Sequence, residues 1–294
     1  MNPVTITLRR EGARADVARR GAELRGWHEQ GRDLMWDRDP HWWPCSSPIL
    51  FPIVGRLKDG QTRIGGRSYA MPAHGFAATQ DFDVRSIGAD EVTLVLSSND
   101  ETRALYPFEF ELSLRYRLHE TGLQLSLQVF NAGDARMPFA LGLHPGFRWP
   151  FTLPTRERHA IVFDADDSPQ VPVVTDDGLL ASTRTKLPMT ARRLALDSSL
   201  FEHDALCFLD AHSRSLRFES PDGAAIVVAA RGFAHWALWS KPGAPLLCIE
   251  AWTGHADADD FEGEFGDRPS TRWLVPGASS THGIDLRFTP PRLE

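Results

Sequence analysis

Apolar and polar residues alternate most regularly in the segment 108–131. From Phe110 to Leu118 every second side chain is apolar, and the residues between are charged or polar. After a turn at 119–122, the alternation resumes from Leu123 to Val129. A period of two is typical of strands with one buried face, so this segment predicts an antiparallel hairpin.

The same signals recur along the rest of the chain. A second hairpin is predicted by residues 215–220, a Pro221-Asp222-Gly223 turn and the apolar run 224–230. Further strands are predicted at 92–96, 205–209, 236–239, 246–250 and 283–288.

Helices have little room in this pattern. The 23 Gly and 21 Pro are spread along the sequence, and the most helix-like stretch, 13–24, is interrupted by Gly21 and is interpreted as strand and loop. Many short strands predict an all-β fold, a large antiparallel sandwich or barrel. Without repeats or a convincing linker, residues 1–294 are interpreted as a single domain. The longest loop-like stretch, 164–197, is predicted to be an insertion that forms a substrate rim.

Charge and composition limit the classes of binding partner that this protein can have. The net charge is −7 with both signs interspersed, which disfavours nucleic acid and membrane surfaces as partners. The N-terminal residues lack the apolar core of a signal peptide, so a cytoplasmic protein is expected. Cys45, Cys207 and Cys248 are scattered and are interpreted as small buried side chains.

Four segments place a polar or titratable residue among apolar and turn residues: 48–56, 72–76, 141–147 and 246–252. Glu250 follows a short apolar run, and a carboxylate desolvated at the end of such a strand suits a general base. An exposed or Arg-paired Glu is the competing interpretation.

His144 lies between a strand-like run and a Pro-Gly turn, where an imidazole can exchange protons near neutral pH. A turn histidine bonded to a backbone carbonyl is the alternative, and His74 before Gly75 has the same two interpretations. Arg56 and Asp204 are candidates for binding hydroxyl groups, with a surface arginine and a loop end as alternatives. Aromatic faces that suit sugars lie near these segments, at Trp149, Trp236, Trp239 and Trp252.

No metal or cofactor site is predicted. The spacing of His74, His144, His203 and His255 matches no compact ligand motif. The phosphate-binding GxxxxGK, the dinucleotide GxGxxG after a strand and the GxSxG nucleophile elbow are all missing from the sequence.

In their order along the chain, the four segments resemble the aldose 1-epimerase (galactose mutarotase-like) family, and most closely its LacX-like branch. The resemblance rests on an LFP…G segment and on three further motifs: His74-Gly75-Phe76-Ala77, the segment 141–147 (LGLHPGF), and the CIE.W.G pattern of 248–254. It extends over nearly the whole chain. A single antiparallel β-sandwich and cofactor-free interconversion of sugar anomers are what it implies.

The resemblance also implies residue roles. Glu250 corresponds to the base that removes the proton of the C1 hydroxyl, and His144 to the acid that protonates the ring oxygen. His74 corresponds to a histidine that orients the sugar, and Arg56 and Asp204 to substrate contacts. The segment around Arg56 varies within the family, and Arg272-Trp273 stands where relatives often have lysine, so the sugar itself is left open.

Two other functions fit the same scaffold. A non-catalytic sugar-binding protein has no need of a matched acid–base pair. A mutarotase for hexose 6-phosphates requires two or more cationic side chains at the pocket rim. Candidates for these besides Arg56 are Arg85, Arg148, Arg231 and Lys241. The pattern specifies no oligomeric state.

Overall fold

The alternating segment forms a long hairpin in the computed structural model, which describes residues 4–292. Strands β10 (Phe110–His119) and β11 (Gly122–Asn131) pair antiparallel through all ten residues of each strand. The predicted apolar positions from Phe110 to Val129 are buried, and the positions between them are largely exposed or half-buried. The sequence pattern therefore specified both the hairpin and its buried face.

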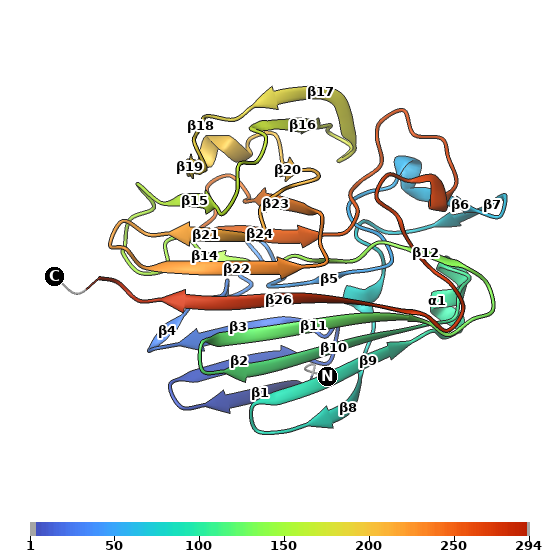
Figure 1. Cartoon of the computed structure of the whole chain (residues 1–294), viewed down its shortest axis with the longest axis horizontal. Coiled ribbons are helices and arrows are strands. Elements are labelled where there is room, and N and C mark those ends of the chain that lie inside the picture. The colour runs from blue at the N-terminus through green and yellow to red at the C-terminus, as the bar shows by residue number, and fades with distance from the viewer. Residues whose placement is uncertain (1–3, 293–294) are drawn as a thin grey trace.

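This hairpin belongs to a ten-stranded antiparallel sheet. The long strand β26 (Ser279–Thr289) lies between β11 and β22 and joins the two halves of the sheet (Figure 1). The remaining strands, in order from one edge, are β18 (Met189–Thr190), β19 (Arg193–Ala195), β15 (Ala160–Phe163), β21 (Ser215–Glu219) and β22 (Ala225–Arg231), and beyond β10 come β9 (Glu91–Ser97) and β8 (Asp83–Ile87). The predicted second hairpin is β21–β22, so it is confirmed.

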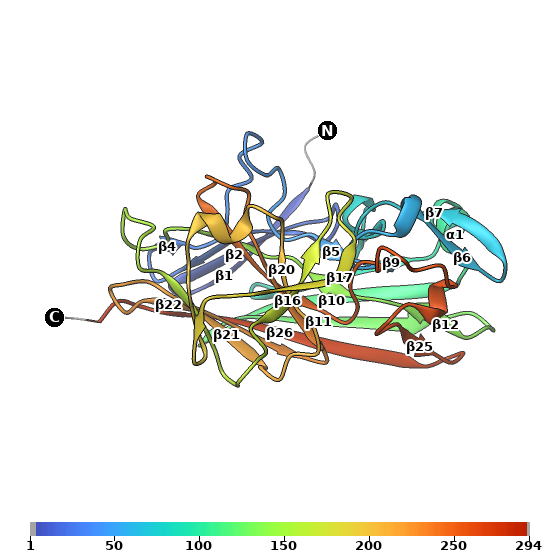
Figure 2. The same cartoon turned by 90° about the horizontal axis from the view of Figure 1, so that it is seen from above.

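A four-stranded sheet packs across one end of the large sheet. Its strands are β1 (Thr5–Arg10), β2 (Ala13–Ala18), β3 (Leu24–Glu29) and β4 (Arg32–Asp33). Strands β1 and β2 contact β9 and β10, and Figure 2 shows this sheet on one side of the molecule, with β26 and β21 on the other. Apolar side chains of both sheets form one core, so the two layers make a β-sandwich. The interpretation of 13–24 as strand and loop is confirmed.

A six-stranded sheet lies at the other end and carries the candidate site. Its strands are β20 (Leu206–Phe208), β23 (His235–Trp239), β24 (Leu246–Trp252), β13 (Gly142–Leu143), β5 (Ile49–Leu50) and β14 (Gly146–Arg148). All seven residues of β24 are buried. Leu247, Ile249 and Ala251 face the main core, so Cys248 and Glu250 face the opposite side.

Three short hairpins or strand pairs complete the β structure, and one of them corrects a prediction. They are β6 (Gln61–Ile64) with β7 (Arg67–Ala70), β12 (Met137–Phe139) with β25 (Arg272–Leu274), and β16 (Gln170–Val174) with β17 (Leu180–Lys186). The segment 164–197 was expected to be loop, but it contains β16, β17, β18 and β19. Most of β17 is solvent-exposed, so its sequence lacks the buried face that alternation reveals.

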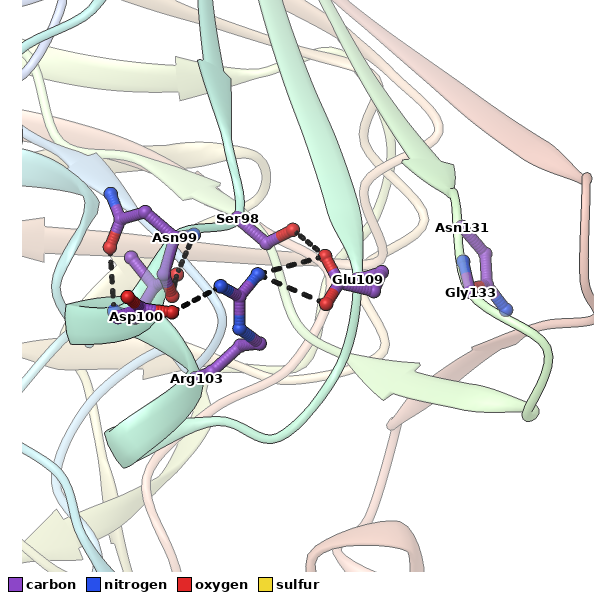
Figure 3. Close-up of polar contacts among 8 residues, drawn as sticks. Ser98, Asn99, Asp100, Arg103, Glu109, Asn131 and Gly133 are labelled. Carbon is purple, nitrogen blue, oxygen red and sulfur yellow. Dashed lines mark hydrogen bonds and ion pairs between the residues drawn. The ribbon is translucent and has the colours of Figure 1, made fainter.

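Helical structure is confined to short segments, as the composition predicts. Helix α1 (Asp100–Leu105) begins with a capping box, in which the Asn99 side chain accepts from the Thr102 N–H at 2.9 Å. Arg103 pairs with both Asp100 and Glu109 (Figure 3). Short 3-10 turns occupy Lys58–Gly60, Ala77–Thr79, Ser198–Phe201 and Phe265–Asp267. Between residues 4 and 292, no helix has the length and apolar character needed to cross a bilayer.

Candidate active site

Sheet register places His144 and Glu250 opposite each other. Strand β13 pairs with β24 through Leu143 and Ala251, and β14 pairs with β24 through Gly146 and Cys248. Both pairings have the same register, so His144, between them, faces Glu250 across the sheet. Cross-strand neighbours share a face of the sheet, which brings the two side chains together.

The two side chains are in direct contact. His144 Nε2 lies 3.2 Å from Glu250 Oε1, and only 8% of His144 and 1% of Glu250 is exposed. The other carboxyl oxygen, Oε2, accepts a hydrogen bond from Trp252 Nε1 at 3.0 Å. Glu250 lies in the interior of β24, paired with Ala237 of β23, so the prediction of a carboxylate at a strand end was wrong. The continued strand holds the carboxyl group more rigidly than a strand end would.

Burial shifts the pKa values of this pair in opposite directions. Desolvation raises the pKa of Glu250 well above that of an ordinary glutamate, and Trp252 only partly offsets this effect. Desolvation also lowers the pKa of His144 well below that of an ordinary histidine. Over a wide pH range the pair therefore holds a single proton, which suits a site that donates one proton and accepts another.

His74 lies beside this pair. It adopts a left-handed backbone conformation, with φ 64°, and its ring meets that of His144 edge-on at 5.8 Å between centroids. Nδ1 accepts a hydrogen bond from the Gly55 N–H at 3.2 Å, so a neutral His74 carries its proton on Nε2. Burial, and next the Arg56 guanidinium, lowers the pKa of His74 to about 4. At neutral pH this side chain is therefore an uncharged hydrogen-bond donor.

Arg56 and Asp204 lie at the exposed rim of the same site. A backbone hydrogen bond holds the loop that carries Arg56, because the Asp257 N–H donates to the Arg56 carbonyl at 2.9 Å. Asp257 is in turn paired with the buried Arg268. Gly178, in the turn between β16 and β17, lies under the aliphatic part of Arg56, where a Cβ would come within 2.6 Å of Cδ.

One cavity of about 450 Å³ brings together all five predicted site residues, Arg56, His74, His144, Asp204 and Glu250. Its size falls within the range usual for small-molecule sites. Val174, Gly178 and Leu180 also line it, so the segment 164–197 does border the cavity as expected.

Sequence reasoning missed Trp43 and Cys45, which line the cavity and lie in a loop without a recognisable motif. Trp239 and Trp252 line the cavity as well. Trp149 and Trp236 do not line it; their indole N–H groups donate to the carbonyls of Arg156 and Ser213.

The four cationic side chains considered above for binding a phosphate group lie outside the cavity. Arg85, Arg148 and Arg231 pair with acidic residues elsewhere, and Lys241 donates to the His41 carbonyl. Arg272 and Trp273 belong to β25 and are also outside the cavity. Among the described residues, no group of three or more His, Cys, Asp or Glu side chains is arranged to hold a metal ion.

A carboxyl group and an imidazole thus face each other inside a cavity of an antiparallel β-sandwich, an arrangement that can exchange protons with a bound small molecule. The sequence profile of the Aldose 1-epimerase family matches residues 4–257, and the chain belongs to this family. The chromosomal protein LacX of Lactococcus lactis subsp. lactis is 28% identical over 295 residues, which cover 96% of this chain and 99% of that protein.

Solved structures agree with this assignment. A galactose mutarotase related enzyme from Lactobacillus acidophilus is 28% identical with a TM-score of 0.90, covering 98% of each chain. A galactose mutarotase-like protein from Lactobacillus casei ATCC 334 is 26% identical with a TM-score of 0.89, covering 97% of this chain and 100% of that one. A galactose 1-epimerase from Lactobacillus acidophilus NCFM, at 17% identity and a TM-score of 0.71, has the same fold over 98% of this chain and 95% of its own.

Proposed function

We propose that this protein is an aldose 1-epimerase that interconverts the α and β anomers of an unphosphorylated hexose. The observation that carries the proposal is the 3.2 Å contact between His144 Nε2 and Glu250 Oε1 in the cavity. Ring opening of a cyclic aldose needs a base at the C1 hydroxyl and an acid at the ring oxygen. Both oxygens are bonded to C1, so the two catalytic groups must be close neighbours.

The reaction follows from this geometry. Glu250 takes the proton of the C1 hydroxyl, the electron pair freed on that oxygen forms the aldehyde C=O, and the C1 to ring-oxygen bond breaks. The electron pair of that bond goes to the ring oxygen, which takes a proton from His144. Rotation about C1–C2 and reversal of both transfers close the ring as the other anomer. Ring opening leaves Glu250 protonated and His144 neutral, so in ring closure Glu250 is the acid and His144 the base, and the turnover ends with both groups in their starting states.

The pKa directions are compatible with this cycle. Burial favours the uncharged pair, in which Glu250 holds the proton and His144 is neutral. Transfer of this proton from Oε1 to Nε2 gives the charged pair, with Glu250 as base and His144 as acid. Both forms hold one proton: the charged pair has the proton states that ring opening requires, and the uncharged pair is the state that ring opening leaves.

His74, Arg56 and Asp204 are assigned to the substrate. A neutral His74 with its proton on Nε2 donates to a sugar oxygen, while Arg56 donates to and Asp204 accepts from hydroxyl groups. Of the described residues that line the cavity, Arg56 is the one with a permanent positive charge. A phosphate group would be expected to meet at least two cations, which favours an unphosphorylated sugar. We also assign the protein to the cytoplasm, with the sugar as its partner.

The test is the optical rotation of freshly dissolved α-glucose and α-galactose with the wild type and with Glu250→Gln, His144→Asn and Glu120→Gln. Loss of one acid or base group is expected to slow anomer exchange by about 10²- to 10⁴-fold. Glu120 lies exposed in the β10–β11 turn, so Glu120→Gln controls for a lost carboxylate and should match the wild type. Equal rates for the wild type and Glu250→Gln would refute catalysis and favour a sugar-binding protein. A strong preference for glucose 6-phosphate would refute the unphosphorylated substrate.

A further inference from the structure

The imidazole of His144 is enclosed by aromatic rings. Trp43 stacks on its face, with 4.9 Å between ring centroids and 27° between the planes. Trp239 and His74 meet it edge-on, each at 5.8 Å. Nε2 faces Glu250, whereas Nδ1 is buried and has no hydrogen-bond partner among the described residues.

This arrangement is unusual for a proton-transferring histidine. The orientation and tautomer of such a ring are commonly set by an acceptor on its second nitrogen. No acceptor from the described part of the chain meets hydrogen-bond geometry with Nδ1 of His144, so the packing of the neighbouring rings contributes to holding the ring plane. Trp43 covers the face of the ring, and rotation of His144 about Cβ–Cγ would drive the imidazole into the indole.

Trp43 is itself held in place by the loop and by a motif residue. Trp36 Nε1 donates to the Trp43 carbonyl at 2.8 Å, and the Trp43 N–H donates to the Asp39 carbonyl at 2.9 Å. Gly146, two residues after His144, leaves the space that the indole occupies. A Cβ at this position would lie 2.9 Å from Trp43 Cζ3. This close approach gives Gly146 of the LGLHPGF segment a physical role.

We propose that Trp43 is a positioning residue that holds the His144 ring in line with Glu250, in place of the missing acceptor on Nδ1. The proposal rests on the function proposed above. The charged groups around His144 are Glu250 on β24 and His74 on the neighbouring loop, with Arg56 beyond His74 and Asp204 beyond Glu250. Three thiols complete the titratable groups: Cys45 and Cys207 line the cavity, and Cys248 lies two residues before Glu250. Removal of the indole would admit water to His144 and free its ring, but it would leave all of these groups in place.

The experiment compares Trp43→Ala, Trp43→Phe and Gly146→Ala with Trp42→Ala. Trp42 is the matched control, because it lies on the same loop but contacts His41 and Lys241 outside the cavity. Trp43→Ala is expected to lower kcat of anomer exchange by about 10- to 100-fold, the size of effect that a misplaced catalytic group produces. Trp43→Phe should restore most of kcat, and Trp42→Ala should match the wild type. Gly146→Ala should lower kcat with the indole still present.

NMR of the ¹⁵N-labelled histidines provides a readout that does not depend on activity. The pH titration of His144, assigned through His144→Asn, should move towards that of an ordinary histidine in Trp43→Ala and stay near the wild type in Trp43→Phe. A higher KM with unchanged kcat and titration would refute positioning and make Trp43 a wall of the sugar site. If the wild type exchanges no anomers, the proposed function fails, and the titrations still decide whether Trp43 holds His144. Should Trp43→Ala not fold, Gly146→Ala replaces it as the variant with a displaced indole, and Trp43→Phe remains the variant expected to match the wild type.

Discussion

Replacing Arg268 by Ala should weaken both the fold and sugar binding. Arg268 and Asp257 are each about 3% exposed at their side chains and form an ion pair. Arg268 Nη2 also donates to the His255 carbonyl at 2.8 Å, and Asp257 Oδ2 accepts from the Lys58 N–H at 3.0 Å. The substitution leaves a buried carboxylate without its cation, which costs about 3 to 5 kcal/mol.

This cost converts into a measurable shift in Tm. An unfolding entropy of about 2.1 cal/mol/K per residue gives about 0.6 kcal/mol/K for the 294 residues. Arg268→Ala should therefore lower Tm by roughly 5 to 8 °C in a thermal unfolding scan. Arg85→Ala is the control, because Arg85 makes a two-pronged pair with Glu111 at the surface. An exposed pair contributes at most about 1 kcal/mol, so Tm should fall by less than about 2 °C.

The same substitution should affect the substrate rim. Asp257 holds the loop that carries Arg56 through the hydrogen bond to its carbonyl, so Arg268→Ala should raise KM more than it lowers kcat. Equal Tm shifts for Arg268→Ala and Arg85→Ala would refute a stabilising role of the buried Arg268–Asp257 pair. A Tm shift of the expected size without a change in KM would show that the pair stabilises the fold but does not orient Arg56.

Three further predictions concern pH, backbone strain and thiol reactivity. Because burial raises the pKa of Glu250 and lowers that of His144, kcat/KM should be flat around neutral pH, falling at alkaline pH as the pair loses its proton and at acid pH as it gains a second. Polarimetry across the pH range tests this, and a decline through about 6.5, as for an ordinary histidine, would contradict it. Gly75→Ala should destabilise the fold by more than about 1 kcal/mol, because φ is 76° and a Cβ would lie 2.2 Å from a carbonyl oxygen. Gly66→Ala, with φ 77° and open space around it, should cost less in the same denaturant titration, and equal losses would show that the close contact is immaterial. Cys207 and Cys248 are buried as expected, but Cys45 is only half-buried, because it lines the cavity. This partial burial still raises the pKa of the Cys45 thiol, so iodoacetamide should label the folded protein more slowly than the unfolded chain, as mass spectrometry can measure; equal rates would refute the pKa shift.

The fold was predictable where the pattern is local. The β10–β11 and β21–β22 hairpins have adjacent strands and a regularly buried face, so their alternation is visible in the sequence. Strand β17 was missed because most of its residues face solvent, and an exposed strand has no apolar period.

The site was predictable in its parts but not in its geometry. His144 and Glu250 stand out because each interrupts an apolar run, yet their contact depends on the register of strands that are distant in the chain. The stacking of Trp43 on His144 is also a long-range contact, and the Trp43 loop has no motif that marks it. The catalytic and binding roles of these residues stay predictions until the variants above are measured.

The common register of β13 and β14 on β24 has a consequence for how this site can change in evolution. A shift of β24 by one residue would turn Glu250 towards the main core and bring an apolar neighbour to the cavity. The strand pairing itself therefore sets the distance between His144 and Glu250, and a change in a loop does not alter it. Rim segments such as the β16–β17 turn carry no such constraint, so a new sugar preference can arise there while the chemistry stays fixed.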